Sequence, residues 1–221
     1  MCTNYRPTRE SEWVRHRLGV DLPADYPDEI YPGQASPLVV KSHQSGRVAC
    51  GLARFGLIPP WAKDTKISRH TYNARSETAS QKPSFKTAWR QRQFGLVLVD
   101  HFYEPSYQTG RPVRWKIALE SGEPFAIGCL WDRWNDPDTG DIIASFAMLT
   151  INADPHPVMN RFHKAQDEKR TPVVIPAHLH HDWLGADHDR ATRLMALQTM
   201  PILTSSAAPS GPKNPRLTDP A

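Results

Sequence analysis

Proline occurs throughout the chain: 21 of its 221 residues are proline and only 12 are glycine. Proline lacks a backbone N–H and interrupts helices and central strands. Its spacing therefore predicts short elements joined by many turns, without an internal repeat. A hydrophobic share of 39% still provides enough apolar side chains for one globular domain with a buried core.

Short apolar and β-branched runs predict a sheet without regular βαβ alternation. The expected strands cover 37–42, 48–57, 94–99, 114–119, 125–131, 145–151 and 172–175. The expected helices cover 8–18, 84–92, 178–184 and 191–197, with Thr8 and Ser84 as caps of the first two. The predicted class is α+β: a largely antiparallel, barrel-like sheet with peripheral helices.

The chain is expected to form one domain over residues 1–203, followed by a flexible tail over 204–221. That tail has four prolines and too few apolar residues to offset the entropy of ordering it. No run approaches the roughly 20 apolar residues of a membrane-spanning helix. Because the first residues also lack the apolar region of a secretory signal, we expect a cytoplasmic protein.

Charge is unevenly distributed. The net charge is only +4, but residues 61–95 contain eight lysines and arginines against two acidic residues, a local +6. A concentrated positive segment favours contact with a polyanion. Three widely spaced cysteines, at positions 2, 50 and 129, form no C-x-x-C pair and argue against a disulfide scaffold or a zinc ribbon.

Cys2 follows the initiator methionine. Loss of Met1 would place a free α-amine beside a thiol. Such an amine, with an ordinary pKa of about 7.7–8.0, is partly neutral near pH 7 and can attack an aldehyde to give an imine. The thiol can then add to the same carbon and close a thiazolidine ring. A cysteine at this position by chance is the simpler alternative.

Three further segments carry candidate groups. Asn73 and Arg75 lie inside the basic segment, where a turn and a solvated charge are the alternative reading. Glu104 follows the apolar run 94–99, a common place for acid–base work, although a surface turn would also suit it. His163 can exchange a proton near neutral pH, as can any of the ten histidines.

In this order and at these spacings, the segments resemble the SOS-response-associated peptidase (SRAP) family over about residues 1–200. They are Met1-Cys2, Gly56 to Ala62, Asn73-Ala74-Arg75-Ser76-Glu77-Thr78, Phe102-Tyr103-Glu104, His163 and Thr171 to Pro176. The resemblance implies a bifurcated barrel-like sheet and a protein that loses Met1, through its own peptidase activity or otherwise. It further implies a covalent thiazolidine between Cys2 and an abasic site in single-stranded DNA, with accompanying lyase activity.

The same resemblance implies residue roles. Asn73 would position Cys2, Glu104 would relay protons, and His163 would help to open or eliminate the sugar. Arg75 and Trp61 would contact phosphates and bases, and we add the basic residues Lys63, Arg90 and Arg170 to the expected DNA-binding set. Trp89 could stack on DNA too, but its helical context favours a core position.

Three departures from the family pattern bear on these roles. Thr3-Asn4 replaces the usual Gly-Arg, Pro105 replaces a tryptophan after Glu104, and residues 164–169 lengthen the segment between His163 and Arg170. The first two remove an arginine and an aromatic surface expected to contact DNA. The third leaves His156 as an alternative catalytic histidine.

Other functions compete with this interpretation. One is a thiol peptidase with Cys2 as nucleophile and His163 as base. Another is a non-catalytic single-strand binder that uses only the basic segment. His178, His180, His181 and His188 suggest a metal site, but a solvated histidine-rich helix is the better interpretation. We expect no cofactor, no metal, no membrane partner and a monomer.

Overall fold

The computed structural model describes residues 2–42 and 44–209. Its strands are β1 (Tyr5–Pro7), β2 (Ala35–Lys41), β3 (Val48–Phe55), β4 (Asn73–Arg75), β5 (Phe94–Ser106), β6 (Val113–Leu119), β7 (Phe125–Asn135), β8 (Ile142–Asn152), β9 (Arg170–Pro172), β10 (Val174–Ile175) and β11 (Leu203–Ala207). Its helices are α1 (Ser11–Leu18), α2 (Lys86–Arg90), α3 (His180–Leu184) and α4 (His188–Leu194). Four 3-10 turns are η1 (Thr65–Arg69), η2 (Met159–Arg161), η3 (Ala177–Leu179) and η4 (Leu197–Thr199).

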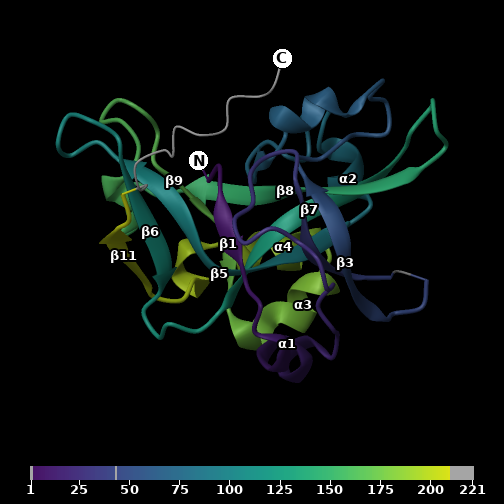
Figure 1. Cartoon of the computed structure of the whole chain (residues 1–221), viewed down its shortest axis with the longest axis horizontal. Helices are drawn as coiled ribbons and strands as arrows, with labels where there is room; N and C mark the ends of the chain where they lie inside the picture. The colour runs from purple at the N-terminus through teal and green to yellow at the C-terminus, as the bar shows by residue number, and fades with distance from the viewer. Residues whose placement is uncertain (1, 43, 210–221) are drawn as a thin grey trace, which may run out of the picture.

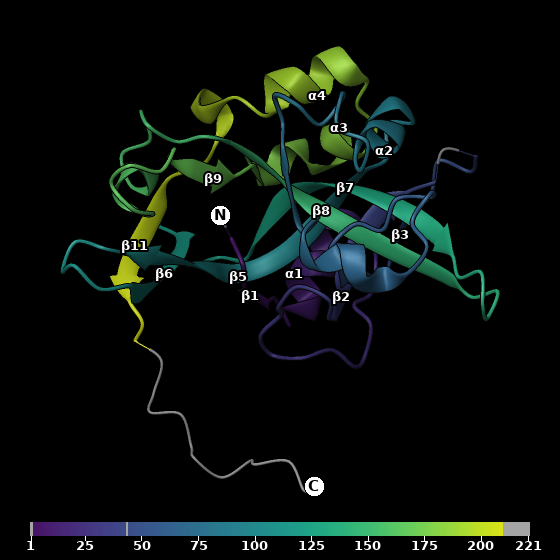
Figure 2. The ribbon, with the colours of Figure 1, turned by 90° about the horizontal axis from the view of Figure 1, so that it is seen from above.

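Five strands close into a barrel in the order β5, β7, β8, β3, β2 and back to β5. Every pairing in the ring is antiparallel except β3 with β8. The predicted α+β, largely antiparallel and barrel-like class is therefore confirmed. Figures 1 and 2 show β6 and β11 at one end of the molecule and the β7–β8 hairpin at the other.

Alternating side chains of the barrel strands divide the core in two. Leu38, Phe55, Val97, Ile127 and Phe146 represent one cluster, to which all five barrel strands contribute. The opposite faces of several strands pack against the helices, where Trp183 of α3 and Leu194 of α4 are buried. Because β5 is covered on both faces, its first half is a continuous apolar run.

The prediction of short elements is wrong for three strands. β5 has 13 residues, and β7 and β8 have 11 each. β7 and β8 occupy stretches of sequence without proline, and the one proline of β5, Pro105, lies next to its end. The prolines therefore limit the connections and strand ends more than the central barrel strands.

Element ends also differ from expectation. Helix α1 begins at Ser11 after Glu10, and the Thr8 hydroxyl instead accepts a hydrogen bond from the Glu10 amide. Ser84 does not cap α2, which starts after Phe85 without a side-chain cap. The expected tail begins too early, because residues 204–207 belong to β11 and pair with β6. Its last twelve residues, 210–221, lie outside the described residues.

Gly56 turns the chain at the end of β3 with a φ of +117°. A Cβ atom there would lie 2.0 Å from the Ser68 carbonyl oxygen, a distance that backbone atoms cannot tolerate. This turn directs the chain toward Trp61. Within the described parts of the chain, none of the helices is long and apolar enough to cross a membrane.

Candidate functional site

The site begins at Cys2, which lies three residues before the start of β1 and is completely buried. Its carbonyl oxygen accepts a hydrogen bond from Asn73 Nδ2 at 2.8 Å, and its Sγ lies 3.5 Å from the Asn4 carbonyl. Asn73 opens β4, where it pairs with Met148 of β8. Strand pairing therefore fixes an amide against the second residue of the chain, far away in sequence.

Glu104 and His163 form the second part of the site. Glu104 lies on β5 with 1% of its surface exposed, and its Oε2 is 3.1 Å from His163 Nε2. Burial, and after it the charge of Glu104, raises the pKa of the Cys2 thiol well above its ordinary value. The Cys2 thiol is therefore protonated at neutral pH and lies within the field of Glu104.

His163 has an unusual backbone. Its φ of +65° lies in the left-handed region, which residues other than glycine seldom adopt. The buried Phe162 precedes it, and its own amide donates to the Pro105 carbonyl at 3.2 Å. Such a conformation costs about 1–3 kcal/mol and persists where surrounding contacts enforce it, often at functional sites.

His156, the alternative catalytic histidine, has another role. Its Nδ1 accepts hydrogen bonds from the amides of Val158 and Met159 at 3.1 and 3.2 Å, at the start of η2. Burial lowers its pKa, so the ring stays neutral as this acceptor requires. The histidine that the structure brings to Glu104 is His163.

Tyr72 is a site residue that the sequence interpretation missed. Burial, followed by the proximity of Cys2 and Glu104, raises the pKa of its phenol. The ring also packs edge-on against Phe55, with centroids 5.7 Å apart. Its position directly before the candidate residue Asn73 is the sequence feature that could have identified it.

Asn4 stands where the family pattern has arginine. Its amide Nδ2 and the Arg114 guanidinium both donate to Glu29 Oε1, which also accepts from the Tyr31 hydroxyl at 2.9 Å. Arg114 comes from β6 and lies 3.3 Å above the centre of the Tyr103 ring. An arginine thus reaches the surroundings of residue 4 from another strand.

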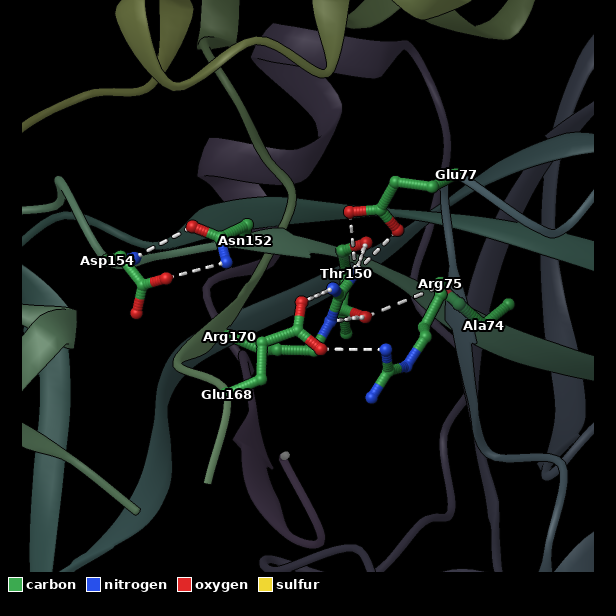
Figure 3. A network of polar contacts seen from close by, with 8 residues as sticks. All are labelled: Ala74, Arg75, Glu77, Thr150, Asn152, Asp154, Glu168 and Arg170. Atoms are coloured by element: carbon green, nitrogen blue, oxygen red, sulfur yellow. Dashed lines mark hydrogen bonds and ion pairs between the residues drawn. The ribbon is translucent and has the colours of Figure 1, made fainter. Parts of the chain in front are cut away.

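A network of arginines and carboxylates surrounds the end of β8 (Figure 3). β4 and β9 both pair with this end of β8, so Arg75 and Arg170 meet beside Thr150. Arg170, an expected DNA-binding residue, is instead 2% exposed and donates to Thr150, Glu168 and Glu77. Arg75 remains 51% exposed at its side chain and pairs with Glu168.

The remaining expected DNA-binding side chains lie at the surface. Trp61 is 55% exposed, and its indole N–H donates to the Pro83 carbonyl at 3.2 Å. Lys63 and Arg90 are exposed as well. Trp89 instead stacks on His188 with centroids 5.6 Å apart and packs against Phe94, as a core residue would.

The histidines of the candidate metal site have separate partners. His180 Nε2 lies 3.2 Å from the Ile175 carbonyl, and burial first of all lowers its pKa to about 4. His188 Nε2 lies 2.9 Å from the Trp89 carbonyl. Over residues 2–42 and 44–209, no three histidine, cysteine or acidic side chains are grouped to hold a metal ion.

Comparisons with known proteins match this arrangement. The model of the family described as SOS response associated peptidase (SRAP) matches residues 1–208. The Abasic site processing protein YoqW of Bacillus subtilis is 29% identical over 205 residues, covering 89% of this chain and 86% of that protein. The Abasic site processing protein HMCES of Pongo abelii is 24% identical and covers 52% of this chain and 40% of that protein.

Solved structures share the fold. A crystal structure of a Bordetella bronchiseptica protein has a TM-score of 0.83 and 30% identity, covering 94% of this chain and 99% of that chain. A protein from Bacteroides thetaiotaomicron has a TM-score of 0.74 at 17% identity, covering 93% of this chain and 91% of its own. The second likeness concerns the fold alone.

Proposed function

The chain belongs to the SOS response associated peptidase family, and on that premise we propose that it processes abasic sites by coupling itself covalently to DNA through Cys2. The substrate is single-stranded DNA whose abasic deoxyribose has opened to its aldehyde. The observation that carries the proposal is the meeting of Cys2, Asn73, Glu104 and His163 in one buried site.

The chemistry proceeds in two bond-forming steps. The α-amine of Cys2 adds to the sugar C1′ aldehyde, and the resulting carbinolamine loses water to give an imine. The thiol sulfur then bonds to the same carbon while its proton goes to nitrogen, which closes the thiazolidine ring. The product contains the protein and the oligonucleotide less one water. Proximity favours closure, because amine and thiol belong to one residue.

The other side chains supply orientation and protons. Asn73 holds the Cys2 carbonyl and thereby restricts the rotation of the amine. Its Oδ1 is buried without a hydrogen-bond partner among the described residues, so it can accept from the Cys2 amine. Glu104 and His163 form a proton-transfer pair for opening the sugar and dehydrating the carbinolamine.

The state of the thiol favours this chemistry over a general thiol peptidase. A cysteine peptidase attacks with a thiolate, which requires a lowered thiol pKa. Burial and the Glu104 charge act in the opposite direction at Cys2. The proposal therefore assigns the first attack to the amine. Removal of Met1, by the protein or by a cellular aminopeptidase, is the only peptide cleavage that it includes.

Removal of Met1 is a requirement of the proposal. In the chain with residue 1 attached, no part of Cys2 is exposed to solvent. Processing must free the amine and give the aldehyde access to it. The imine then has a second fate, because loss of a proton from the neighbouring sugar carbon breaks the strand by β-elimination and gives weak lyase activity.

Intact-mass analysis tests the proposal. The purified protein should lack one methionine, and incubation with a single-stranded abasic oligonucleotide should add the oligonucleotide mass less one water. The adduct should survive denaturant. A protein that retains Met1, or that gives no adduct with abasic DNA after losing it, would contradict the proposal.

Substituting Glu104→Gln should slow adduct formation by about a hundredfold, since general acid–base groups contribute about 10²–10⁴ in rate. The amide keeps the size of the side chain but cannot relay a proton. The measurement is the rate of adduct formation at neutral pH, with the thermal unfolding midpoint as a check on folding. Glu120→Gln is a matched control, because Glu120 is exposed; equal rates for both variants would exclude the role of Glu104.

Substituting Arg75→Ala should weaken non-covalent binding several-fold and reduce the salt dependence. Each phosphate contact on single strands contributes about 0.7 to the slope of log affinity against log salt. Arg15→Ala is the control, since Arg15 is also an exposed, ion-paired arginine but lies on α1, away from β9 (Figure 1). Fluorescence anisotropy over a salt series measures the difference; an unchanged slope would remove Arg75 from the DNA-binding surface.

A further inference from the structure

One carboxylate joins the two arginines beside the end of β8. Glu168 Oε2 lies 2.7 Å from Arg75 Nη1, and Glu168 Oε1 lies 2.6 Å from Arg170 Nη1. Figure 3 shows the carboxylate between the two guanidinium groups. A phosphate with two free oxygens presents the same pair of acceptors to a pair of arginines. Glu168 therefore has the contacts of a bound anion.

We propose that Glu168 is an internal competitor for the DNA phosphate at Arg75 and so determines how tightly the protein holds single strands. The inference rests on the proposed function, because it concerns the phosphate contact of that same site. Binding exchanges the Arg75–Glu168 pair for an Arg75–phosphate pair. Glu168 belongs to residues 164–169, the segment that is longer here than in the family pattern.

The exchange is feasible because the competing pair is exposed. The side chains of Arg75 and Glu168 are 51% and 35% accessible to solvent. Ion pairs at such positions are worth about 0–1 kcal/mol, so a phosphate can displace the carboxylate. Partial burial opposes ionisation of Glu168, but the hydrogen bond and charge of Arg170 and the charge of Arg75 lower its pKa. The competitor is therefore charged at neutral pH.

Displacement of Glu168 leaves the buried arginine held. Arg170 keeps its bonds to Glu77 Oε2 at 2.8 Å and to the Thr150 carbonyl at 2.7 Å. Lys169 holds the two ends of the segment 164–169 together, because its Nζ donates to the carbonyls of Lys164 at 2.6 Å and His163 at 3.4 Å. Glu168 can thus move while these contacts keep His163 in place.

The competition has a functional consequence. Every single strand must displace Glu168, whether damaged or not, so the affinity for intact DNA is lowered. An abasic strand is captured by a covalent bond and depends less on long residence. Glu168 therefore favours release of undamaged strands over damaged ones.

The test measures equilibrium affinity for a single-stranded oligonucleotide with a tetrahydrofuran abasic analogue, which has no aldehyde and cannot react. Glu168→Gln should bind about 2- to 5-fold more tightly, the ratio that corresponds to an exposed ion pair of about 0.5–1 kcal/mol. Glutamine still accepts a hydrogen bond from Arg170. Asp154→Asn is the matched control, because Asp154 is a nearby exposed carboxylate that pairs with Asn152 (Figure 3).

A double-mutant cycle separates competition from general electrostatics. In an Arg75→Ala background, Glu168→Gln should lose its gain in affinity, whereas the effect of Asp154→Asn should persist. An equal gain with and without Arg75, or the same gain from Asp154→Asn, would overturn the proposal. Adduct formation by the unaltered protein on reactive abasic DNA is measured in parallel. If that adduct is absent the proposed function fails, and if only the cycle fails this inference alone is wrong.

Discussion

Replacing Cys2 with alanine should abolish the denaturant-resistant adduct on abasic DNA completely. Alanine retains the α-amine after Met1 removal, so an imine can still form and hydrolyse, but no sulfur is present to close a ring. The measurement is denaturing gel electrophoresis together with intact mass. Equilibrium binding to the unreactive abasic analogue should change little, because Cys2 is buried and does not belong to the proposed phosphate-contacting surface.

Cys2→Ser distinguishes the chemical steps. A hydroxyl is a poorer nucleophile than a thiol toward the imine, so this variant should form a linkage that survives only after reduction with borohydride. A stable adduct from Cys2→Ala without reduction would disprove thiazolidine formation. If the unaltered protein forms no adduct, and Cys2→Ala binds the oligonucleotide as tightly as the unaltered protein does, the result would instead favour the non-catalytic single-strand binder.

Replacing Arg170 with methionine should destabilise the fold strongly. Arg170 is 2% exposed, and its guanidinium donates hydrogen bonds to Glu77, Glu168 and Thr150. Hydrogen bonds made by a charged group are worth about 1.5–3 kcal/mol. The carboxylates of Glu77 and Glu168 are 49% and 35% exposed, so water solvates them once the guanidinium is gone, and they add little to this cost. For a domain of this size the loss corresponds to roughly 3–12 °C in the thermal unfolding midpoint. Arg75→Ala is the control and should shift the midpoint little, because the Arg75 side chain is exposed.

The pH dependence of stability gives a second readout for Arg170. Burial opposes the effect, but the hydrogen bond and charge of Arg170 lower the pKa of Glu77. A lowered folded-state pKa adds stability above the unfolded value of about 4.3, and that stability is lost as the pH falls through the folded value. Arg170→Met should therefore flatten the acid limb of the stability curve. A variant as stable and as acid-sensitive as the unaltered protein would refute the structural role.

Local patterns predict most of the barrel strands and a barrel-like class, but not which strands pair to close the barrel. The apolar run 94–99 and the run 125–131 appear in the structure as parts of β5 and β7. The parallel pairing of β3 with β8 joins segments about ninety residues apart, and only the packing of the whole barrel selects it. β1, β4 and β11 escape prediction because short edge strands contain too few residues for a period to show.

Motifs in the sequence identify the residues of the candidate site, whose roles stay a prediction. Cys2, Asn73, Glu104 and His163 were chosen from sequence, and the structure brings them together. Arg170 differs, since its burial depends on carboxylates from two other segments, which no local pattern reveals. Glu168 escaped notice for the same reason: its partners are Arg75, far away in sequence, and Arg170.

The order of the proposed site residues along the chain determines when, during synthesis, the bond after Met1 is accessible to other enzymes. Cys2 leaves the ribosome before the other residues of the proposed site, and His163 follows 161 residues later. At about 5–20 residues per second, that interval lasts roughly 8–32 s. During it the wall that buries Cys2 is incomplete, and a cellular aminopeptidase can reach the first peptide bond. Under the proposed function, a chain that folds before this bond is cleaved must open the same wall again to expose the amine of the buried Cys2.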